Sequence, residues 1–222
     1  MASLDTTRPF IPVNIAVLTV SDTRTAANDT SGDALADRIL QAGHKLAARA
    51  IEKDDTAAIE ARVRERLRAL AVEHEILECD PDFADTAAFC ARYGVPPEQS
   101  ANTIVVAARK EPGVACACLV LATCRLDVNH TVCDLLGVRK ASFASAEQTR
   151  DLTGMMIGGV TPFGLPEKLP LYIDEHVMQQ PAVVIGGGSR SMKVRLAPAG
   201  LLRLPGARVI EGLAAVVEAA QP

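Results

Sequence analysis

Gly-Gly-Val-Thr-Pro-Phe-Gly at residues 158–164 and Gly-Gly-Gly-Ser-Arg-Ser at residues 186–191 are the most informative stretches of this chain. Each closes an apolar segment with backbone that carries few side chains. Such backbone lets a ligand approach peptide N–H and C=O groups directly. We therefore expect the two glycine clusters to line a pocket for a small ligand. The alternative is that both clusters are only tight turns between strands.

The composition is that of a globular chain with enough apolar residues for a core. Of 222 residues, 49% are hydrophobic and 23% are charged, which suits one large domain or two small ones. The net charge of −4 argues against a surface covered with basic charge, so a local patch must hold any nucleic acid. No stretch approaches the roughly 20 apolar residues of a membrane span, and the start lacks a signal-peptide pattern. We expect a cytoplasmic protein with no membrane partner.

The cysteines are expected to be free thiols, because a chain of this size does not need disulfides to hold its core. They are Cys79, Cys90, Cys116, Cys118, Cys124 and Cys133. Alternate residues of a strand share one face, so Cys116 and Cys118 can meet. However, no Cys-x-x-Cys pair or histidine pair completes a zinc tetrahedron. We expect core packing for these thiols, a structural role for His130 and no metal site.

The first part of the chain has a βαβα pattern. Residues 13–20 form a mostly apolar, β-branched run typical of a buried parallel strand. A helix over 31–42 follows, capped by Ser31, and then a strand over 45–52 and an amphipathic helix over 56–70. Asp22, Asp54 and Asp55 fall at strand ends, where helix capping and solvation explain them.

The second part, after residue 70, predicts a compact mixed α/β domain because strand-like runs now follow one another closely. The expected strands cover 74–79, 102–108, 114–123, 171–174, 182–187 and 193–197. The expected helices cover 84–93, 127–136, 145–151 and 199–203.

From about residue 63 to residue 214 the chain resembles the YbaK/ProX family of aminoacyl-tRNA editing domains. The matching stretches are Val72–Glu75 through Cys79–Pro81, Ala101–Val106, Leu136–Ala141, 158–164 and 187–190, in the order of the family. The resemblance implies an enzyme that hydrolyses the ester between a wrong amino acid and the 3′ end of a tRNA, without a cofactor. Its expected partners are the tRNA acceptor end and, as a candidate, an aminoacyl-tRNA synthetase.

From about residue 10 to residue 62 the chain instead resembles the start of the MoaB/MogA molybdopterin-binding family. The matching stretches are Val17–Arg24, Asp29–Asp33 and Lys53–Asp55. The Thr-Gly-Gly-Thr-Gly loop that holds the pterin phosphate in that family is missing here. We therefore expect a truncated βαβα segment at 1–62 and a mixed-sheet, YbaK-like editing domain at 63–222, both α/β. The truncated segment exposes a sheet edge, so it docks on the second domain, forms a homo-oligomer or is poorly ordered.

The YbaK/ProX resemblance implies that the two glycine clusters form opposing walls of an editing pocket. It assigns catalytic parts to Asn102, Thr161, Gly187 and Gly188. It assigns substrate contacts to Thr103, Gly158, Gly159, Pro162, Gly164, Ser189 and Arg190. Guanidinium and ammonium groups bind phosphates, so Arg190, Lys193, Arg139 and Lys140 are candidates to hold the acceptor end, the alternative being a solvated charged face.

Asn102 departs from the family pattern, in which many members have a lysine. An ammonium near the ester stabilises negative charge, whereas an amide only orients a water or donates a neutral hydrogen bond. This difference keeps a second function open, that of a non-catalytic protein which binds aminoacyl-tRNA or another small ligand. A third function, molybdenum cofactor biosynthesis, follows from residues 10–62 alone.

Overall fold

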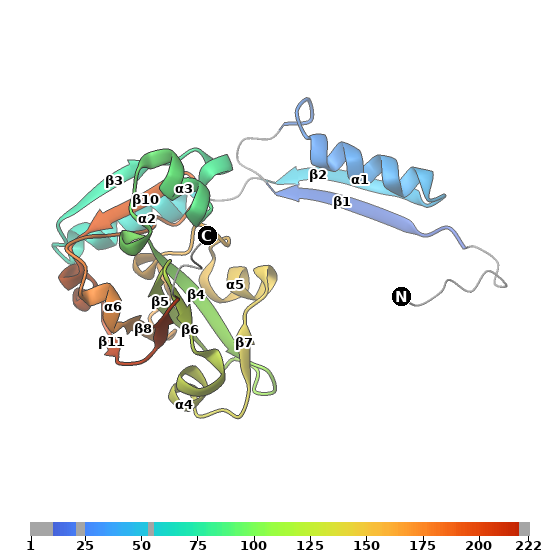
Figure 1. Cartoon of the computed structure of the whole chain (residues 1–222). Coiled ribbons are helices and arrows are strands. Elements are labelled where there is room, and N and C mark those ends of the chain that lie inside the picture. Colours follow the sequence, from blue (N-terminus) through green and yellow to red (C-terminus); the bar gives the residue numbers. More distant parts are fainter. Residues whose placement is uncertain (1–10, 21–24, 53–55, 218–222) are drawn as a thin grey trace, which may run out of the picture. The chain divides into compact units, whose positions relative to one another are not determined.

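The chain divides into two compact units, Met1–Thr56 and Ala57–Pro222 (Figure 1). The structure, a computed structural model, describes residues 11–20, 25–52 and 56–217. The predictions for Asp22, Asp54 and Asp55 therefore lie outside the described residues. In the described ranges, no helix has both the length and the apolar character needed to cross a bilayer.

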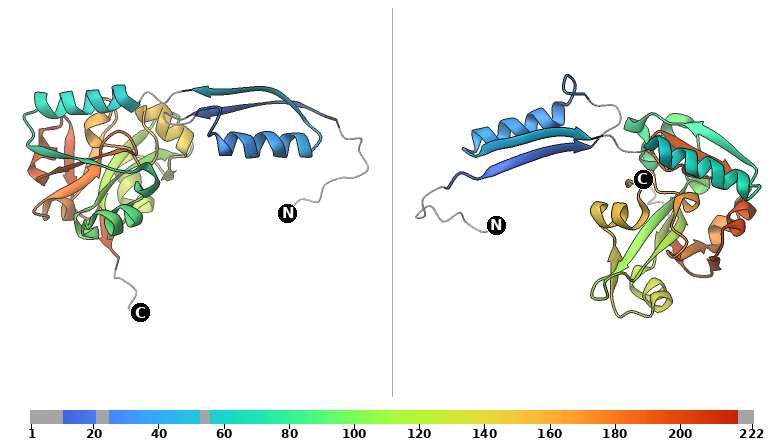
Figure 2. Two further views of the ribbon diagram at one scale, coloured as in Figure 1. Left: turned by 90° about the horizontal axis from the view of Figure 1, so that it is seen from above. Right: turned by 180° about the vertical axis from the view of Figure 1, so that it is seen from behind.

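The first unit consists of two parallel strands and one helix (Figure 2). They are β1 (Asn14–Val20), α1 (Thr30–Gln41) and β2 (Lys45–Glu52). Asp29 caps α1, because its carboxylate accepts the N–H of Gly32 at 3.0 Å, so the prediction of Ser31 as the cap was wrong. The same buried carboxylate pairs with Arg49 of β2 at 2.8 Å. One acidic residue thus fixes both the start of the helix and its place on the strand pair.

The core of the first unit is thin. Val17 and Ala36 are its buried apolar side chains among the described residues, while Leu35 and Leu40 of α1 remain half exposed. Parallel strands are normally covered on both faces. A strand pair with one helix therefore leaves apolar surface open to a partner.

The second unit begins with α2 (Thr56–Ala69), whose Val63 and Leu67 are fully buried. They share a core cluster with residues of an antiparallel sheet in the order β3-β10-β9. These strands are β3 (His74–Glu78), β9 (Val183–Gly186) and β10 (Met192–Leu196).

A five-stranded mixed sheet in the order β11-β8-β5-β4-β7 forms the centre of the second unit (Figure 1). Its strands are β4 (Ala101–Ala108), β5 (Ala115–Leu121), β7 (Ala141–Phe143), β8 (Leu171–Asp174) and β11 (Ala207–Ile210). β8 is parallel to β5 and β11, whereas β4 is antiparallel to both of its neighbours. β6 (Cys124–Leu126) and β12 (Ala214–Val216) pair in a separate two-stranded antiparallel sheet. The predicted mixed α/β class is confirmed.

Short helical segments connect these strands. The α-helices are α3 (Thr86–Tyr93), α4 (Cys133–Leu136), α5 (Ala146–Thr153) and α6 (Glu175–Met178). Short segments of other helix types are η1 (Pro81–Phe83), η2 (Pro97–Gln99), η3 (Val128–Val132), η4 (Pro162–Gly164) and η5 (Pro198–Arg203). The helix expected over 127–136 is a π-helical turn followed by α4, and the one expected over 199–203 is the 3-10 segment η5.

The apolar run over 114–123 is explained by β5, whose seven residues are all buried. Its two faces contribute to separate core clusters. Cys116 and Cys118 share one face with their Sγ atoms 3.8 Å apart. All six cysteines are free, as predicted.

Candidate functional site

The two glycine clusters lie in direct contact with each other. The N–H of Gly188 donates to the carbonyl of Gly159 at 2.8 Å. A Cβ on Gly159 would stand 2.7 Å from the carbonyl carbon of Ser189, and one on Gly186 would stand 2.2 Å from the carbonyl oxygen of Val160. Only glycine therefore permits this approach. The clusters touch backbone to backbone instead of facing each other across open space.

A cavity of about 430 Å³ lies beside this contact, a volume typical of a small-molecule site. It is bounded by β4, the start of α3, β9 and the residues Ile157, Gly158 and Val160. β7 pairs only with Val106–Ala108 of β4. Among the described residues, the earlier part of β4 therefore has no strand partner on that side, and its residues Ala101–Val105 line the cavity. Asn102, Thr103 and Gly158 are the predicted site residues that line it.

The other glycines predicted for the site lie outside the cavity lining. The N–H of Gly187 donates to the carbonyl of Met192 at 3.0 Å, and that of Gly188 is used by Gly159. The N–H of Gly159 donates to Met156 at 3.0 Å, and that of Gly164 donates to Thr161 at 3.2 Å. These four N–H groups therefore hold the loops in shape.

Ser189 and Arg190 tie the second glycine cluster to distant segments. The Ser189 hydroxyl donates to Glu60 of α2 at 2.5 Å. The Arg190 guanidinium donates to the carbonyl of Pro81 and pairs with Asp85 at 3.1 Å. This hydrogen bond and charge lower the pKa of Asp85, a residue of the cavity lining. Arg190 thus braces the cavity wall.

Lys193 of β10 places an ammonium in the cavity lining, although only 8% of the residue is exposed. Its Nζ donates to the carbonyls of Ala84 and Gly158 at 3.0 Å each, and lies 5.5 Å from the ring centre of Phe89. Burial lowers the pKa of this lysine below its ordinary 10.5. An ammonium has three N–H donors, so these two bonds leave one for a ligand. Sequence reasoning had placed Lys193 among the phosphate-binding candidates, and no local signal marks it as buried.

Asn102 is oriented by a neighbour. The Thr86 hydroxyl donates to Asn102 Oδ1 at 2.8 Å, which leaves the amide NH₂ as the free donor on the cavity side. Among the described residues, the buried hydroxyls of Thr103 and Thr161 have no hydrogen-bond partner. An unpaired buried hydroxyl is unfavourable by about 1–3 kcal/mol. Thr103 belongs to the cavity lining, although its hydroxyl oxygen is itself buried.

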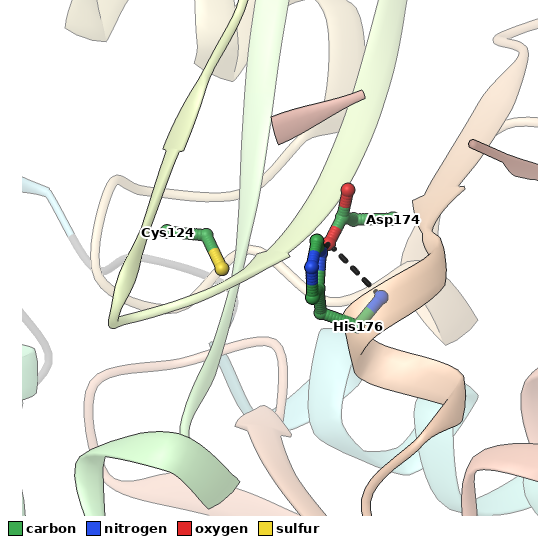
Figure 3. A group of neighbouring side chains, drawn as sticks. All are labelled: Cys124, Asp174 and His176. Atoms are coloured by element: carbon green, nitrogen blue, oxygen red, sulfur yellow. Dashed lines mark hydrogen bonds and ion pairs between the residues drawn. The ribbon is translucent and has the colours of Figure 1, made fainter. Parts of the chain in front are cut away.

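A second polar group lies at the end of β8, where Cys124, Asp174 and His176 offer ligand atoms within 4.8 Å of one another (Figure 3). The buried Asp174 carboxylate already accepts the N–H of His176 and of Ala214, and lies 2.8 Å from His176 Nδ1. It therefore caps α6 and anchors β12. The structural role of the carboxylate as cap and anchor accounts for its burial, and the group is not among the residues predicted for the site.

Comparisons with known proteins place one family match inside the second unit. The sequence profile of the family described as "Aminoacyl-tRNA editing domain" matches residues 80–204. A solved structure described as a candidate trans-editing enzyme for prolyl tRNA synthetase superposes with a TM-score of 0.59 at 29% identity. That match covers 69% of this chain and 95% of the other.

Two curated relatives with different names match the chain. A candidate Cys-tRNA(Pro)/Cys-tRNA(Cys) deacylase, EbsC of Enterococcus faecalis, is 29% identical over 75 residues, which cover 34% of this chain and 46% of that protein. Molybdenum cofactor biosynthesis protein B of Escherichia coli is 48% identical over 54 residues, which cover 24% of this chain and 32% of that protein. The chain thus spans less than half the length of either relative.

Proposed function

The chain belongs to the aminoacyl-tRNA editing domain family, and on this premise we propose that it is an aminoacyl-tRNA deacylase. The observation that carries the proposal is the cavity inside the matched region, which holds the Lys193 ammonium and the Asn102 amide in its lining. Both groups are held by neighbours, and preorganised donors of this kind stabilise charge that develops in a transition state.

The proposed substrate is a tRNA that carries a small, uncharged, wrong amino acid. Most side chains of the cavity lining are apolar, among them Ala101, Val105 and Ile157. The relatives are named for Cys-tRNA(Pro), Cys-tRNA(Cys) and prolyl tRNA synthetase. Cys-tRNA(Pro) is therefore the first substrate to test.

In the proposed reaction, a water molecule attacks the carbonyl carbon of the aminoacyl ester. The carbonyl oxygen becomes an oxyanion, which accepts the third N–H of Lys193 and the Asn102 NH₂. The bond between the carbonyl carbon and the ribose oxygen then breaks, and the proton lost by the water ends on that oxygen. The products are the free amino acid and the uncharged tRNA.

The predicted residues divide into two roles in this proposal. Asn102, Thr103 and Gly158 contact the substrate from the cavity lining. The remaining ones shape or brace the loops behind it: Gly159, Thr161, Pro162, Gly164, Gly187, Gly188, Ser189 and Arg190. Lys193 takes the part that the family pattern gives to a lysine at the position of Asn102.

The test is to incubate the full chain with a panel of mischarged tRNAs that includes Cys-tRNA(Pro), and to follow the loss of the amino acid. We expect release from at least one mischarged tRNA and none from correctly charged Pro-tRNA(Pro). The absence of release from every member of the panel at enzyme excess would end the enzymatic proposal.

A non-catalytic binding protein is the second candidate, favoured by the amide at position 102. Substituting Asn102→Lys discriminates between the two. If the wild-type chain is inactive and the Asn102→Lys variant hydrolyses the ester, the wild-type chain is a binding protein with an inactive site. A wild-type chain that is already active is the proposed deacylase.

The segment at 1–62 is proposed to be a remnant of the molybdenum cofactor family, supported by the match over 54 residues. The proposed partners of the chain are the tRNA acceptor end, an aminoacyl-tRNA synthetase and a second copy of the chain, in the cytoplasm. A molybdenum-cofactor function instead requires pterin binding, and calorimetry with the pterin tests it.

A further inference from the structure

Phe143 lies at the junction of two cavities. It lines the 430 Å³ cavity of the candidate site and also a second, more open cavity of about 790 Å³. The aromatic residue is 59% exposed, in a chain with only 3% aromatic residues. Its strand, β7, runs along the edge of the sheet between α5 and α4 (Figure 1). Ala144 and Thr149, after β7 in the chain, line the first cavity, and Ala141 and Ser142 of β7 line the second.

The second cavity differs from the first in its charge. Arg109 and Arg125, both exposed, line it together with His130 and Ser142. Just before β7 stand Arg139 and Lys140, which are also exposed. The N–H of Arg109 donates to the carbonyl of Lys140 at 3.0 Å. Basic residues of three segments thus lie in the lining of the second cavity or directly before β7.

One carboxylate faces this basic group from the same cavity. Asp127 lines it, but its oxygens accept the N–H groups of His130 and Thr131 and lie 3.2 Å from His130 Nδ1. The Asp127 carboxylate therefore caps the start of η3. Glu111, in the turn between β4 and β5, is also exposed. Glu175 also lies nearby, since it accepts the N–H of the lining residue Gly212 at 3.0 Å. In the lining itself, Arg109 and Arg125 stand against the single carboxylate of Asp127.

From this arrangement we infer that the groove over Phe143 binds the single-stranded 3′ end of the RNA, while the terminal aminoacyl-adenosine occupies the first cavity. Arg109 and Arg125 pair with phosphates of the preceding nucleotides, and the ring of Phe143 stacks on a base. This inference rests on the proposed function and adds the path that the single-stranded RNA follows over the protein surface. Guanidinium groups fork onto phosphate oxygens, and an exposed ring supplies a stacking surface for any base.

The first test measures binding without catalysis. A fluorescent RNA oligonucleotide with the tRNA 3′-terminal sequence is titrated with the full chain, and anisotropy gives the dissociation constant. We expect Phe143→Ala to weaken binding about 10-fold, within the range measured for base stacking. Arg109→Ala with Arg125→Ala should also reduce the dependence of binding on salt concentration. Equal affinities for wild type and variants would overturn the inference whether or not the protein is a deacylase.

The second test compares two substrates, a full aminoacyl-tRNA and an aminoacyl ester of adenosine alone. We expect the Arg109→Ala, Arg125→Ala variant to raise KM about 10-fold for the tRNA and to hydrolyse the short ester like wild type. Arg208→Ala, on β11 at the opposite edge of the same sheet, is the matched control and should leave both rates unchanged. A wild-type chain that hydrolyses neither ester contradicts the proposed function. An equal loss on both substrates contradicts the groove.

Discussion

At the scale of single residues, the proposed reaction assigns to Lys193 the charge that the amide at position 102 cannot supply. Its Nζ is held by the carbonyls of Ala84 and Gly158. We expect Lys193→Met, which keeps the length of the side chain but removes the donors, to lower kcat by about 10²–10³-fold, as for the loss of an oxyanion donor. Folding should be retained, because methionine removes a charge that is unfavourable to bury. Single-turnover deacylation together with thermal unfolding separates the two effects, and unchanged kcat would assign Lys193 a structural role.

The pH dependence gives an independent test of the same residue. Burial lowers the pKa of Lys193 below 10.5, so the folded chain releases this proton at a pH where the unfolded chain still holds it. Activity should fall as pH rises through the folded pKa, because the ammonium becomes neutral. The free energy of unfolding should rise over the same window up to 10.5, relative to Lys193→Met. In Lys193→Arg the alkaline fall should move to higher pH, and a profile shared by wild type and Lys193→Arg would contradict this account.

At the scale of elements, the contact between the two glycine clusters sets the shape of the site. In Gly159→Ala the new Cβ would meet backbone atoms of Ser189 at 2.7–2.9 Å. We expect a loss of about 2 kcal/mol in the free energy of unfolding, typical of overpacking, with loss of deacylation. Gly113→Ala is the control, since a Cβ there meets nothing within 4 Å and only the φ of +83° is unfavourable, by about 1 kcal/mol. Urea unfolding and activity of both variants check this, and equal activity in the two would contradict it.

Long or strongly patterned elements could be predicted from the sequence. The approach of the two glycine clusters followed from the family resemblance, whereas the contacts of Lys193 could not be predicted. The apolar run of β5 and the helix α2 are visible in local pattern. β7, β11 and β12 have three or four residues each, too few for a periodicity to appear. Lys193 alternates with apolar residues like any strand residue whose side chain faces solvent. The Lys193 ammonium is held by the carbonyl of Ala84, 109 residues away in sequence, and no local pattern carries that information.

At the scale of the whole molecule, α2 decides where an independent folding unit begins. Val63 and Leu67 are fully buried, and Glu60 accepts the Ser189 hydroxyl. We expect the fragment Thr56–Pro222 to fold and deacylate like the full chain. The fragment Val63–Pro222 lacks Ile59, which packs against the core, and Glu60, which accepts the Ser189 hydroxyl. It should therefore unfold at a lower urea concentration than the longer fragment. A fragment from residue 70 lacks the fully buried side chains of Val63 and Leu67. It should not fold, because burial of these two side chains contributes about 3–6 kcal/mol to the free energy of unfolding. Equal stability of the first two fragments would place the boundary at residue 63 instead.

The first unit leads us to expect self-association of the full chain. Two parallel strands with one helix leave both outer strand edges without a partner among the described residues, and Val13, Leu35 and Leu40 are about half exposed. Open edges and apolar faces of this kind are covered in stable proteins. We therefore expect the full chain to sediment as a dimer at micromolar concentration and the fragment Thr56–Pro222 to sediment as a monomer. A full chain that stays monomeric over the same range would show that the first unit is covered by another partner or by none. A dimeric fragment would place the interface in the editing domain.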